Sequence, residues 1–199
     1  MSEFEAGFIH ISELRKTRLL LLSHFIEAKI KSRTPANLNF ICTHNSRRSH
    51  IAQVWAQAAA LHYELNNIHC FSGGTEATAV NPRAVTALTK VGFQIVATNS
   101  TANPRYEAHY ANHAPPLILF SKVYSDAFNP TQFAAIMTCA QADESCPVVA
   151  GAEKRISLPY NDPKDFDGTP QEEEKYTERV LEIGREICFA FSKVNTRSR

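Results

Sequence analysis

The chain has 199 residues, a length typical of one globular domain with an extension, and 44% of its residues are apolar, enough for a proper core. Lysine and arginine number 21 against 20 aspartates and glutamates. The formal net charge of +1 gives no electrostatic reason to expect a nucleic acid or an anionic membrane as partner. No apolar run is long enough to span a bilayer, and the apolar run at residues 19–22 lacks a cleavage-site pattern, so we expect a cytoplasmic location.

The five cysteines do not form a pattern typical of secreted or metal-binding proteins. An odd number of cysteines without a secretion signal argues against a disulfide framework. Neither a CxxC nor an HExxH motif occurs, so the sequence predicts no metal site. Cys70 lies inside a predicted strand and Cys188 inside a predicted helix, and we expect both to be core residues.

Residues 1–36 are predicted to form an N-terminal helical extension to a domain over residues 37–199. Ser12 can cap a helix from about residue 13 to residue 31, which the pair Thr34-Pro35 ends. One face of this helix carries an apolar row of Leu22, Ile26 and Ile30. We expect this face to pack on the chain's own domain; a dimer contact and a membrane-surface helix are the alternatives.

Strand and helix patterns alternate after the extension. Strands are predicted over residues 37–42, 68–71, 133–138 and 155–158, and helices over residues 49–65, 84–91 and 170–192. This order is typical of an α/β protein in which helices cover a parallel sheet. Residues 72–76 are predicted to be a flexible turn. Residues 98–131 are irregular, with a strand or an edge hairpin at 117–123.

The segment from Cys42 to Ser49 carries most of the chemical information. A strand, a tight loop and a helix start make an anion cradle, because the loop N–H groups point inward and the helix N-terminus adds partial positive charge. Arg48, five intervening residues after Cys42, offers a planar fork to two oxyanion oxygens. The same field favours a nucleophilic Cys42 thiolate, which we expect Ser49 to hydrogen-bond while also capping the helix. The alternative is a buried structural cysteine beside a surface arginine.

Further polar residues follow other predicted strands, and we expect them on the same rim of the sheet as Cys42. Asp162 is the candidate general acid; the alternative is an ordinary turn aspartate before proline. Cys139 and Cys146 enclose residues 140–145. They form either a relay, in which Cys139 attacks the oxidised Cys42 and Cys146 resolves the pair, or a structural cysteine and an incidental one. The spacing leaves both interpretations open.

The segment Cys42–Ser49 resembles the anion loop of the low-molecular-weight tyrosine phosphatase superfamily, and most closely that of its thioredoxin-coupled arsenate reductases. Residues 72–76 with 80–84, residues 137–147 and residues 161–163 resemble further segments of that family. The similarity covers about residues 37–193. It implies a three-layer α/β/α fold with a four-stranded parallel sheet.

By this resemblance Cys42 is the nucleophile, Arg48 the oxyanion binder and Asp162 the acid, while Cys139 and Cys146 pass a disulfide to thioredoxin. The oxyanion-binding loop comprises Thr43, His44, Asn45, Ser46, Arg47, Arg48 and Ser49. Phosphatase members lack the cysteine pair and usually have tyrosine after Asp-Pro, whereas Lys164 stands there in this chain and favours the reductase branch.

Two loop residues depart from the family pattern. His44 stands where the family commonly has glycine, and its side chain either crowds the loop or contacts the substrate. Arg47 replaces a small or apolar residue, and it either favours a larger or more highly charged substrate or points to solvent.

We therefore predict a cytoplasmic arsenate reductase that draws electrons from thioredoxin and needs no metal or organic cofactor. The first alternative is a phosphomonoesterase acting on phosphotyrosine through a phosphocysteine. The second is a non-catalytic module that binds an oxyanion or a phosphoprotein.

Overall fold

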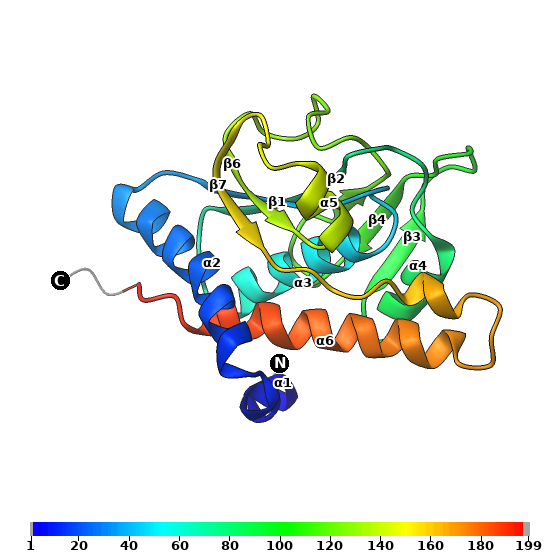
Figure 1. Cartoon of the computed structure of the whole chain (residues 1–199), viewed down its shortest axis with the longest axis horizontal. Helices are drawn as coiled ribbons and strands as arrows, with labels where there is room; N and C mark the ends of the chain where they lie inside the picture. The colour runs from blue at the N-terminus through cyan, green and yellow to red at the C-terminus, as the bar shows by residue number, and fades with distance from the viewer. Residues whose placement is uncertain (1, 197–199) are drawn as a thin grey trace.

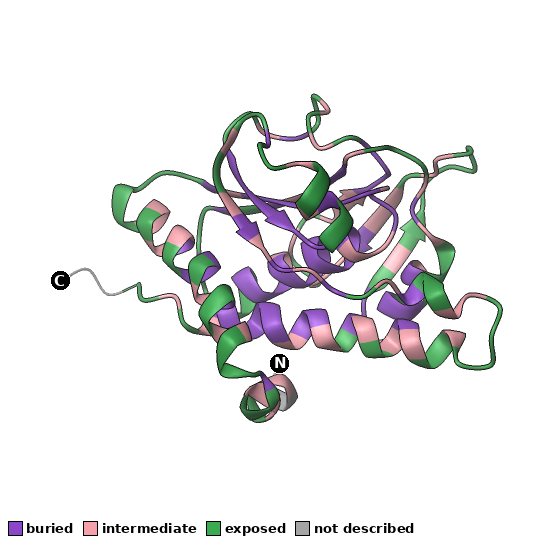
Figure 2. Cartoon of the chain, in the orientation of Figure 1, coloured by how far each residue is buried: buried purple, intermediate pink, exposed green. Residues whose placement is uncertain are grey.

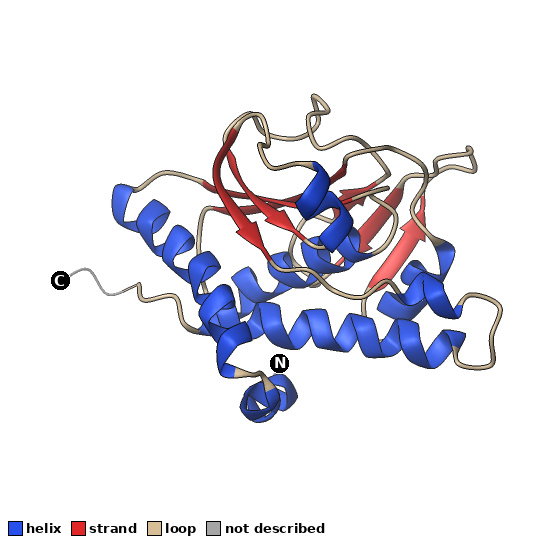
Figure 3. Ribbon diagram, viewed as in Figure 1, coloured by secondary structure: helices blue, strands red, loops and turns tan. Residues whose placement is uncertain are grey.

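The computed structural model describes residues 2–196, and its centre is a four-stranded parallel sheet in the order β2-β1-β6-β7 (Figures 1 and 3). The strands are β1 (Ala36–Cys42), β2 (Ile68–Gly74), β6 (Phe133–Met137) and β7 (Ala152–Ser157). All four predicted strands are therefore confirmed, with shifted ends. The prediction of a flexible turn at 72–76 is wrong for its first half, because residues 72–74 continue β2 and pair with the end of β1.

The long helices also lie where the sequence predicts them. They are α2 (Glu13–Ser32), α3 (Arg48–His62), α4 (Pro82–Lys90) and α6 (Glu172–Ser192). Ser12 caps α2 as expected, since its Oγ accepts a hydrogen bond from the Arg15 N–H at 3.3 Å. Four short helical elements were not predicted: α1 (Ser2–Ala6), α5 (Ala140–Ser145) and the 3-10 turns η1 (Gly7–His10) and η2 (Pro163–Phe166).

The irregular segment contains a second sheet. Strands β3 (Gln94–Ala97), β4 (Tyr106–His109) and β5 (Leu117–Leu119) form a three-stranded antiparallel sheet in that order. The strand expected at 117–123 is thus correct only for its first three residues. Beyond them the chain returns to the parallel sheet, where Val123 forms an isolated bridge with Gly74.

Each face of the parallel sheet packs against its own apolar cluster. The central strands β1 and β6 are accordingly almost wholly buried (Figure 2). On one face Leu38 and Phe40 pack with α2, α3 and α6; on the other Ile41 and Met137 pack with α5. Successive strand side chains point to opposite faces, so a strand buried on both sides is apolar almost throughout. Cys42 belongs to the cluster on the α5 side, and helices on both sides confirm the layered fold.

The N-terminal helix α2 docks on its own domain, as expected. Leu22 and Ile26 are fully buried, and Ser23 Oγ donates to the Ala190 carbonyl of α6 at 2.7 Å. At the far end of α2, Lys29 pairs with Glu153 of β7 at 2.7 Å. Ile30, the third member of the predicted apolar row, is only partly buried.

Replacing Leu22 with alanine should lower the free energy of unfolding by about 2–5 kcal/mol, because it removes a fully buried side chain from the α2–α6 contact. The neighbouring Leu21 is 42% exposed, so Leu21→Ala should cost less than about 1 kcal/mol. Urea unfolding of both variants measures the difference. Equal losses would mean that α2 does not pack as described.

Candidate active site

The loop after β1 holds its carbonyl groups outward. Each carbonyl oxygen from Cys42 to Arg47 accepts a hydrogen bond from a neighbouring segment or from α3. In chain order the donors are Thr75 N (3.1 Å), Glu76 N (2.8 Å), Ser121 Oγ (2.9 Å), His50 Nε2 (2.9 Å), Asn81 N (2.9 Å) and Ile51 N (3.0 Å). Among the described residues, the N–H groups of Thr43 to Arg47 make no hydrogen bond. Outward carbonyls leave these N–H groups to converge on the interior, which makes an anion-binding nest.

The centre of the loop is set by Asn45 and Ser49. Asn45 adopts the left-handed conformation at φ 44°, which asparagine tolerates better than most residues. Its Nδ2 donates to Ser49 Oγ at 2.9 Å, and Ser49 Oγ lies 3.1 Å from Cys42 Sγ. Because the serine oxygen already accepts from Asn45, its own proton is available to the sulfur, where it stabilises a thiolate. The expectation that Ser49 caps the helix is wrong, because α3 begins at Arg48 and Ser49 lies inside its first turn.

Gly74 is required where β2 passes behind the loop. A Cβ at this position would lie 2.6 Å from the Thr43 carbonyl oxygen and 2.7 Å from the Asn45 nitrogen. Both atoms belong to the backbone and cannot swing aside. Only a residue without a side chain lets β2 and the loop approach this closely.

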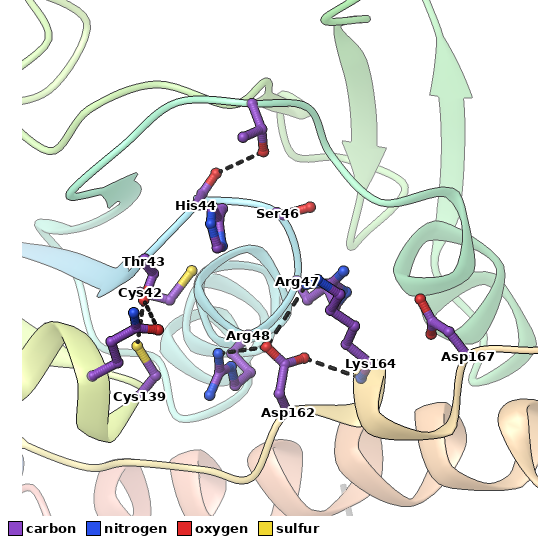
Figure 4. A network of polar contacts seen from close by, with 12 residues as sticks. Cys42, Thr43, His44, Ser46, Arg47, Arg48, Cys139, Asp162, Lys164 and Asp167 are labelled. Atoms are coloured by element: carbon purple, nitrogen blue, oxygen red, sulfur yellow. Dashed lines mark hydrogen bonds and ion pairs between the residues drawn. The ribbon is translucent and has the colours of Figure 1, made fainter.

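Arg48 and Asp162 meet at the mouth of the loop, as Figure 4 shows. Arg48 Nη2 lies 2.6 Å from Asp162 Oδ2, and Arg48 Nη1 donates to the Tyr160 carbonyl at 2.9 Å. Among the described residues, no acceptor faces the buried Nε of Arg48. A buried guanidinium N–H without an acceptor is costly, and an oxyanion bound in the nest would satisfy it.

Arg47 does not point to solvent. Its Nε donates to the hydroxyl of Tyr176 at 3.1 Å, and its Nη1 lies 3.7 Å from Asp162 Oδ2 (Figure 4). The Tyr176 hydroxyl in turn donates to Asp167 Oδ1 at 2.8 Å. Burial raises the pKa of Tyr176 to about 12, so this hydroxyl keeps its proton near neutral pH. Asp162 is thus flanked by two guanidinium groups.

Ser46 and His44 are both held by contacts outside the nest. Ser46 turns away from the nest, because its Oγ donates to the Ala79 carbonyl at 2.7 Å. The backbone of His44 is anchored from outside, since its carbonyl accepts from Ser121 Oγ and also from Thr78 Oγ1 at 3.2 Å. Thr43 directs its hydroxyl toward α5.

Cys139 faces the loop from the N-terminal end of α5. Its Sγ lies 3.4 Å from Thr43 Oγ1 (Figure 4). The same sulfur accepts from the Ala142 N–H at 3.4 Å, so Cys139 caps α5. Cys139 and Cys42 are buried in the same apolar cluster. Cys146 follows the C-terminal end of α5 and is only partly buried. The structure therefore brings two of the three predicted relay cysteines to the loop and places the third one helix away.

Two residues of β7 hold α5 in place. Arg155 pairs with Asp143 Oδ1 at 2.5 Å, and Ser157 Oγ donates to Asp143 Oδ2 at 2.5 Å. Arg155 Nε also donates to the Cys146 carbonyl at 3.2 Å. These contacts, which we did not predict from the sequence, clamp the C-terminal half of the helix against the sheet.

His50 is a second residue that the sequence did not single out. It is fully buried behind the loop, with Nε2 on the Asn45 carbonyl and Nδ1 3.0 Å from Ser72 Oγ. Burial, helped by the nearby charge of Lys122, lowers the pKa of His50 to about 3. The neutral ring therefore donates from Nε2 and accepts from Ser72. A histidine at the second position of a predicted helix gave no sign of this role.

Two further findings concern the described part of the chain. Residues 2–196 contain no group of three or more His, Cys, Asp or Glu side chains that could hold a metal ion. None of the helices in this range is both long and apolar enough to cross a membrane.

Comparisons with known proteins agree with this geometry. The sequence profile of the family described as low molecular weight phosphotyrosine protein phosphatase matches residues 37–113. An arsenate reductase of Bacillus subtilis strain 168 is 30% identical over 149 residues, which is 74% of this chain and 89% of that protein. An arsenate reductase of Oceanobacillus iheyensis is 30% identical over 138 residues, or 69% of this chain and 80% of that protein.

A solved structure supports the fold. The solution structure of a low molecular weight protein tyrosine phosphatase from Bacillus subtilis superposes with a TM-score of 0.54. It covers 79% of this chain and 95% of that one, at 20% identity. At this level of identity the likeness concerns the arrangement of the elements.

Lowering the pH should destabilise the protein through His50. The pKa of His50 is about 3 in the folded chain, whereas the ordinary value of 6.5 applies to the unfolded chain. Between these two pH values the imidazole therefore takes up a proton only in the unfolded chain. The free energy of unfolding should therefore fall as the pH drops from 6.5 toward 3.

The matched variant is His50→Gln, which keeps an N–H donor but does not titrate. Urea unfolding at about pH 7 and about pH 5 should give a smaller loss of stability for His50→Gln than for the wild type. Identical losses would show that His50 is not buried in its neutral form.

Proposed function

Because the chain belongs to the low molecular weight phosphotyrosine protein phosphatase family, we propose that it is an enzyme that uses Cys42 to attack a bound oxyanion, and that its reaction is the reduction of arsenate. The observation that carries the second half of this proposal is the position of Cys139, whose sulfur faces the nucleophile loop across Thr43. The relatives of similar sequence named arsenate reductase give it further support.

The reaction begins in the nest. Arsenate binds to the inward N–H groups and to the Arg48 guanidinium, whose buried Nε has no other acceptor within residues 2–196, and the Cys42 thiolate attacks arsenic. An oxygen leaves as water, with Asp162 as the donor of its proton, and a thiol–arsenate adduct remains. Ser49 stabilises the thiolate before the attack through the 3.1 Å contact with Cys42 Sγ.

The reduction follows by thiol chemistry. The Cys139 thiolate attacks Cys42 Sγ, the sulfur–arsenic bond breaks, and its electron pair stays with arsenic, which leaves as arsenite. Cys42 and Cys139 are now joined by a disulfide. Cys146 attacks Cys139 and releases Cys42 as a thiolate, so the two electrons taken by arsenic come finally from Cys139 and Cys146.

The last exchange requires α5 to unwind. A helix rises about 1.5 Å per residue, so α5 separates the α-carbons of Cys139 and Cys146 by about 10 Å, whereas a disulfide needs roughly 4.4–6.8 Å. The Arg155 and Ser157 contacts with Asp143 must therefore open during the relay. Unwinding also carries the partly buried Cys146 and its new disulfide toward the surface.

A thioredoxin-like dithiol protein is the reductant in this proposal, since it returns the Cys139–Cys146 disulfide to two thiols. The three relay cysteines, Cys42, Cys139 and Cys146, are thiols in the structure, which suits a reducing compartment, and a cytoplasmic location is part of the proposal. Neither a metal nor an organic cofactor enters the steps above.

Phosphomonoester hydrolysis is the second candidate. The contact between Arg48 and Asp162 favours it, because a nucleophile, an anion clamp and an acid are all that a phosphocysteine mechanism requires. Attack on phosphorus shares the first half of the arsenate reaction. Some hydrolysis of an activated phosphate ester is therefore expected from an arsenate reductase of this family.

The relay predicts different outcomes for the two distal cysteines. Cys139→Ser should form no arsenite, while Cys146→Ser should release one arsenite per protein and then stop as a Cys42–Cys139 disulfide. Steady-state arsenate turnover, coupled to thioredoxin and its reductase, should drop about a hundredfold or more in both variants. Hydrolysis of p-nitrophenyl phosphate should persist, because it needs only Cys42, Arg48 and Asp162.

Cys70→Ala is the control, since Cys70 is buried inside β2 and takes no part in the relay. It should retain both activities. Brisk ester hydrolysis in every variant with no arsenite from the wild type would instead identify the protein as a phosphatase.

Removing the Arg155 contacts that hold α5 should make Cys139 more accessible to solvent. Arg155→Met removes the ion pair to Asp143 and the hydrogen bond to Cys146 while keeping the length of the side chain. Hydrogen bonds to charged groups contribute about 1.5–3 kcal/mol, so iodoacetamide should alkylate the buried Cys139 roughly tenfold faster.

Lys154→Met, an exposed neighbour on β7, is the control and should leave the rate unchanged. Alkylation rates at Cys139 are measured by mass spectrometry of the digested protein. If the Arg155→Met rate equals that of the control, the clamp does not limit the opening of α5.

A further inference from the structure

Arg15 links the N-terminal helix α2 to Tyr160, which precedes Asp162 in the same loop. Arg15, in the first turn of α2, forms an ion pair with Glu186 of α6. Its Nη2 and its Nε lie 2.8 Å and 2.9 Å from the same carboxylate oxygen. The Arg15 side chain is only 16% exposed and that of Glu186 only 8%. A largely buried guanidinium held at two nitrogens has little freedom to move.

The face of this guanidinium lies against Tyr160. The Arg15 Cζ atom is 4.6 Å from the centre of the Tyr160 ring, which is itself buried. Cation–π contacts are stronger when both partners are removed from water. Arg15 thus holds the ring of Tyr160. The backbone N–H of Tyr160 donates to the carbonyl of Thr138, which follows β6, at 3.1 Å.

The carbonyl of the same tyrosine orients Arg48. It accepts from Arg48 Nη1 at 2.9 Å, and Asp162, which binds Arg48 Nη2, follows two residues later in the same loop. A shift of Tyr160 would therefore move both groups that aim the guanidinium at the nest. The contacts run without a gap from Glu186 to Arg15, to Tyr160 and to Arg48.

We propose that Arg15 is a positioning residue for the oxyanion site: it holds the Tyr160 ring, and the Tyr160 carbonyl then holds Arg48 in the direction of the nest. Arg15 touches no reacting atom itself. The family profile begins at residue 37, so this support comes from outside the matched segment. The inference rests on the proposed function, because it requires Arg48 to bind the oxyanion.

Inorganic phosphate tests the idea without any turnover. Its dissociation constant is measured by isothermal titration calorimetry on the reduced full-length protein. Arg15→Met, which loses the guanidinium, should weaken phosphate binding roughly tenfold, the effect of one misaligned charged hydrogen bond. Arg15→Lys, which keeps a cation near the ring, should recover part of the loss, and Arg18→Met, exposed on the same helix, should bind as the wild type does.

A double-mutant cycle separates positioning from general damage. Arg48→Lys keeps a cation for phosphate but lacks the guanidinium fork that reaches both Tyr160 and Asp162. If Arg15 acts through Arg48, adding Arg15→Met to Arg48→Lys should change the dissociation constant less than twofold. A full tenfold effect in both backgrounds would overturn the proposal, as would unchanged phosphate binding in Arg15→Met.

A second variant and a parallel measurement of arsenate turnover distinguish a failure of the Arg15 proposal from a folding defect and from a failure of the proposed function. If Arg15→Met does not fold, Glu186→Gln takes its place, since it weakens the fork at its other end and should weaken phosphate binding in the same direction. Normal phosphate binding without arsenate turnover in the wild type would refute the proposed function alone. Arsenate turnover in the wild type with unaltered phosphate binding in the variants would refute the role of Arg15 alone.

Discussion

The outward direction of the carbonyl groups from Cys42 to Arg47 is the constraint on which the site depends. Every one of these oxygens is held by a donor, and all six donors lie outside the loop, in the segment between β2 and α4, in Ser121 and in α3. The inward direction of the N–H groups follows from that arrangement. Position 74 must be glycine, because the backbone of β2 approaches the loop too closely there for a side chain. The site is rigid because the rest of the fold builds it.

The proposed reaction combines this rigid loop with a helix that must open. A helix as short as α5 has little stability of its own, so it persists because β7 and the apolar cluster hold it. The nest gains from being fixed, since preorganised donors need no rearrangement when charge develops. The relay gains from a weak element, because two cysteines at opposite ends of a helix can only meet when it unwinds. In this proposal Arg155 holds α5, the helix that must open, whereas Arg15 holds Tyr160 and through it Arg48, which must stay in place.

The sequence predicted the sheet and its long helices because their apolar periodicity is strong, and it predicted the nest because Cys42, Arg48 and Ser49 lie close together along the chain. It placed Asp162 and Cys139 at the same rim from the rule that parallel strands end on one edge. It did not reveal the buried neutral His50, the clamp on α5 or the path from Arg15, because each depends on contacts between different elements that only packing creates. The antiparallel sheet of β3, β4 and β5 was missed for a different reason: its strands are three or four residues long, too short for a periodic pattern.

The relay itself is tested most directly by mapping disulfides after a single turnover. Reduced protein is mixed with one equivalent of arsenate in the absence of any other reductant, quenched with an alkylating agent and digested for non-reducing mass spectrometry, with arsenite measured in parallel. The account predicts one arsenite per protein, a disulfide between Cys139 and Cys146, and an alkylated Cys42. Unreacted arsenate with all five thiols alkylated would contradict it.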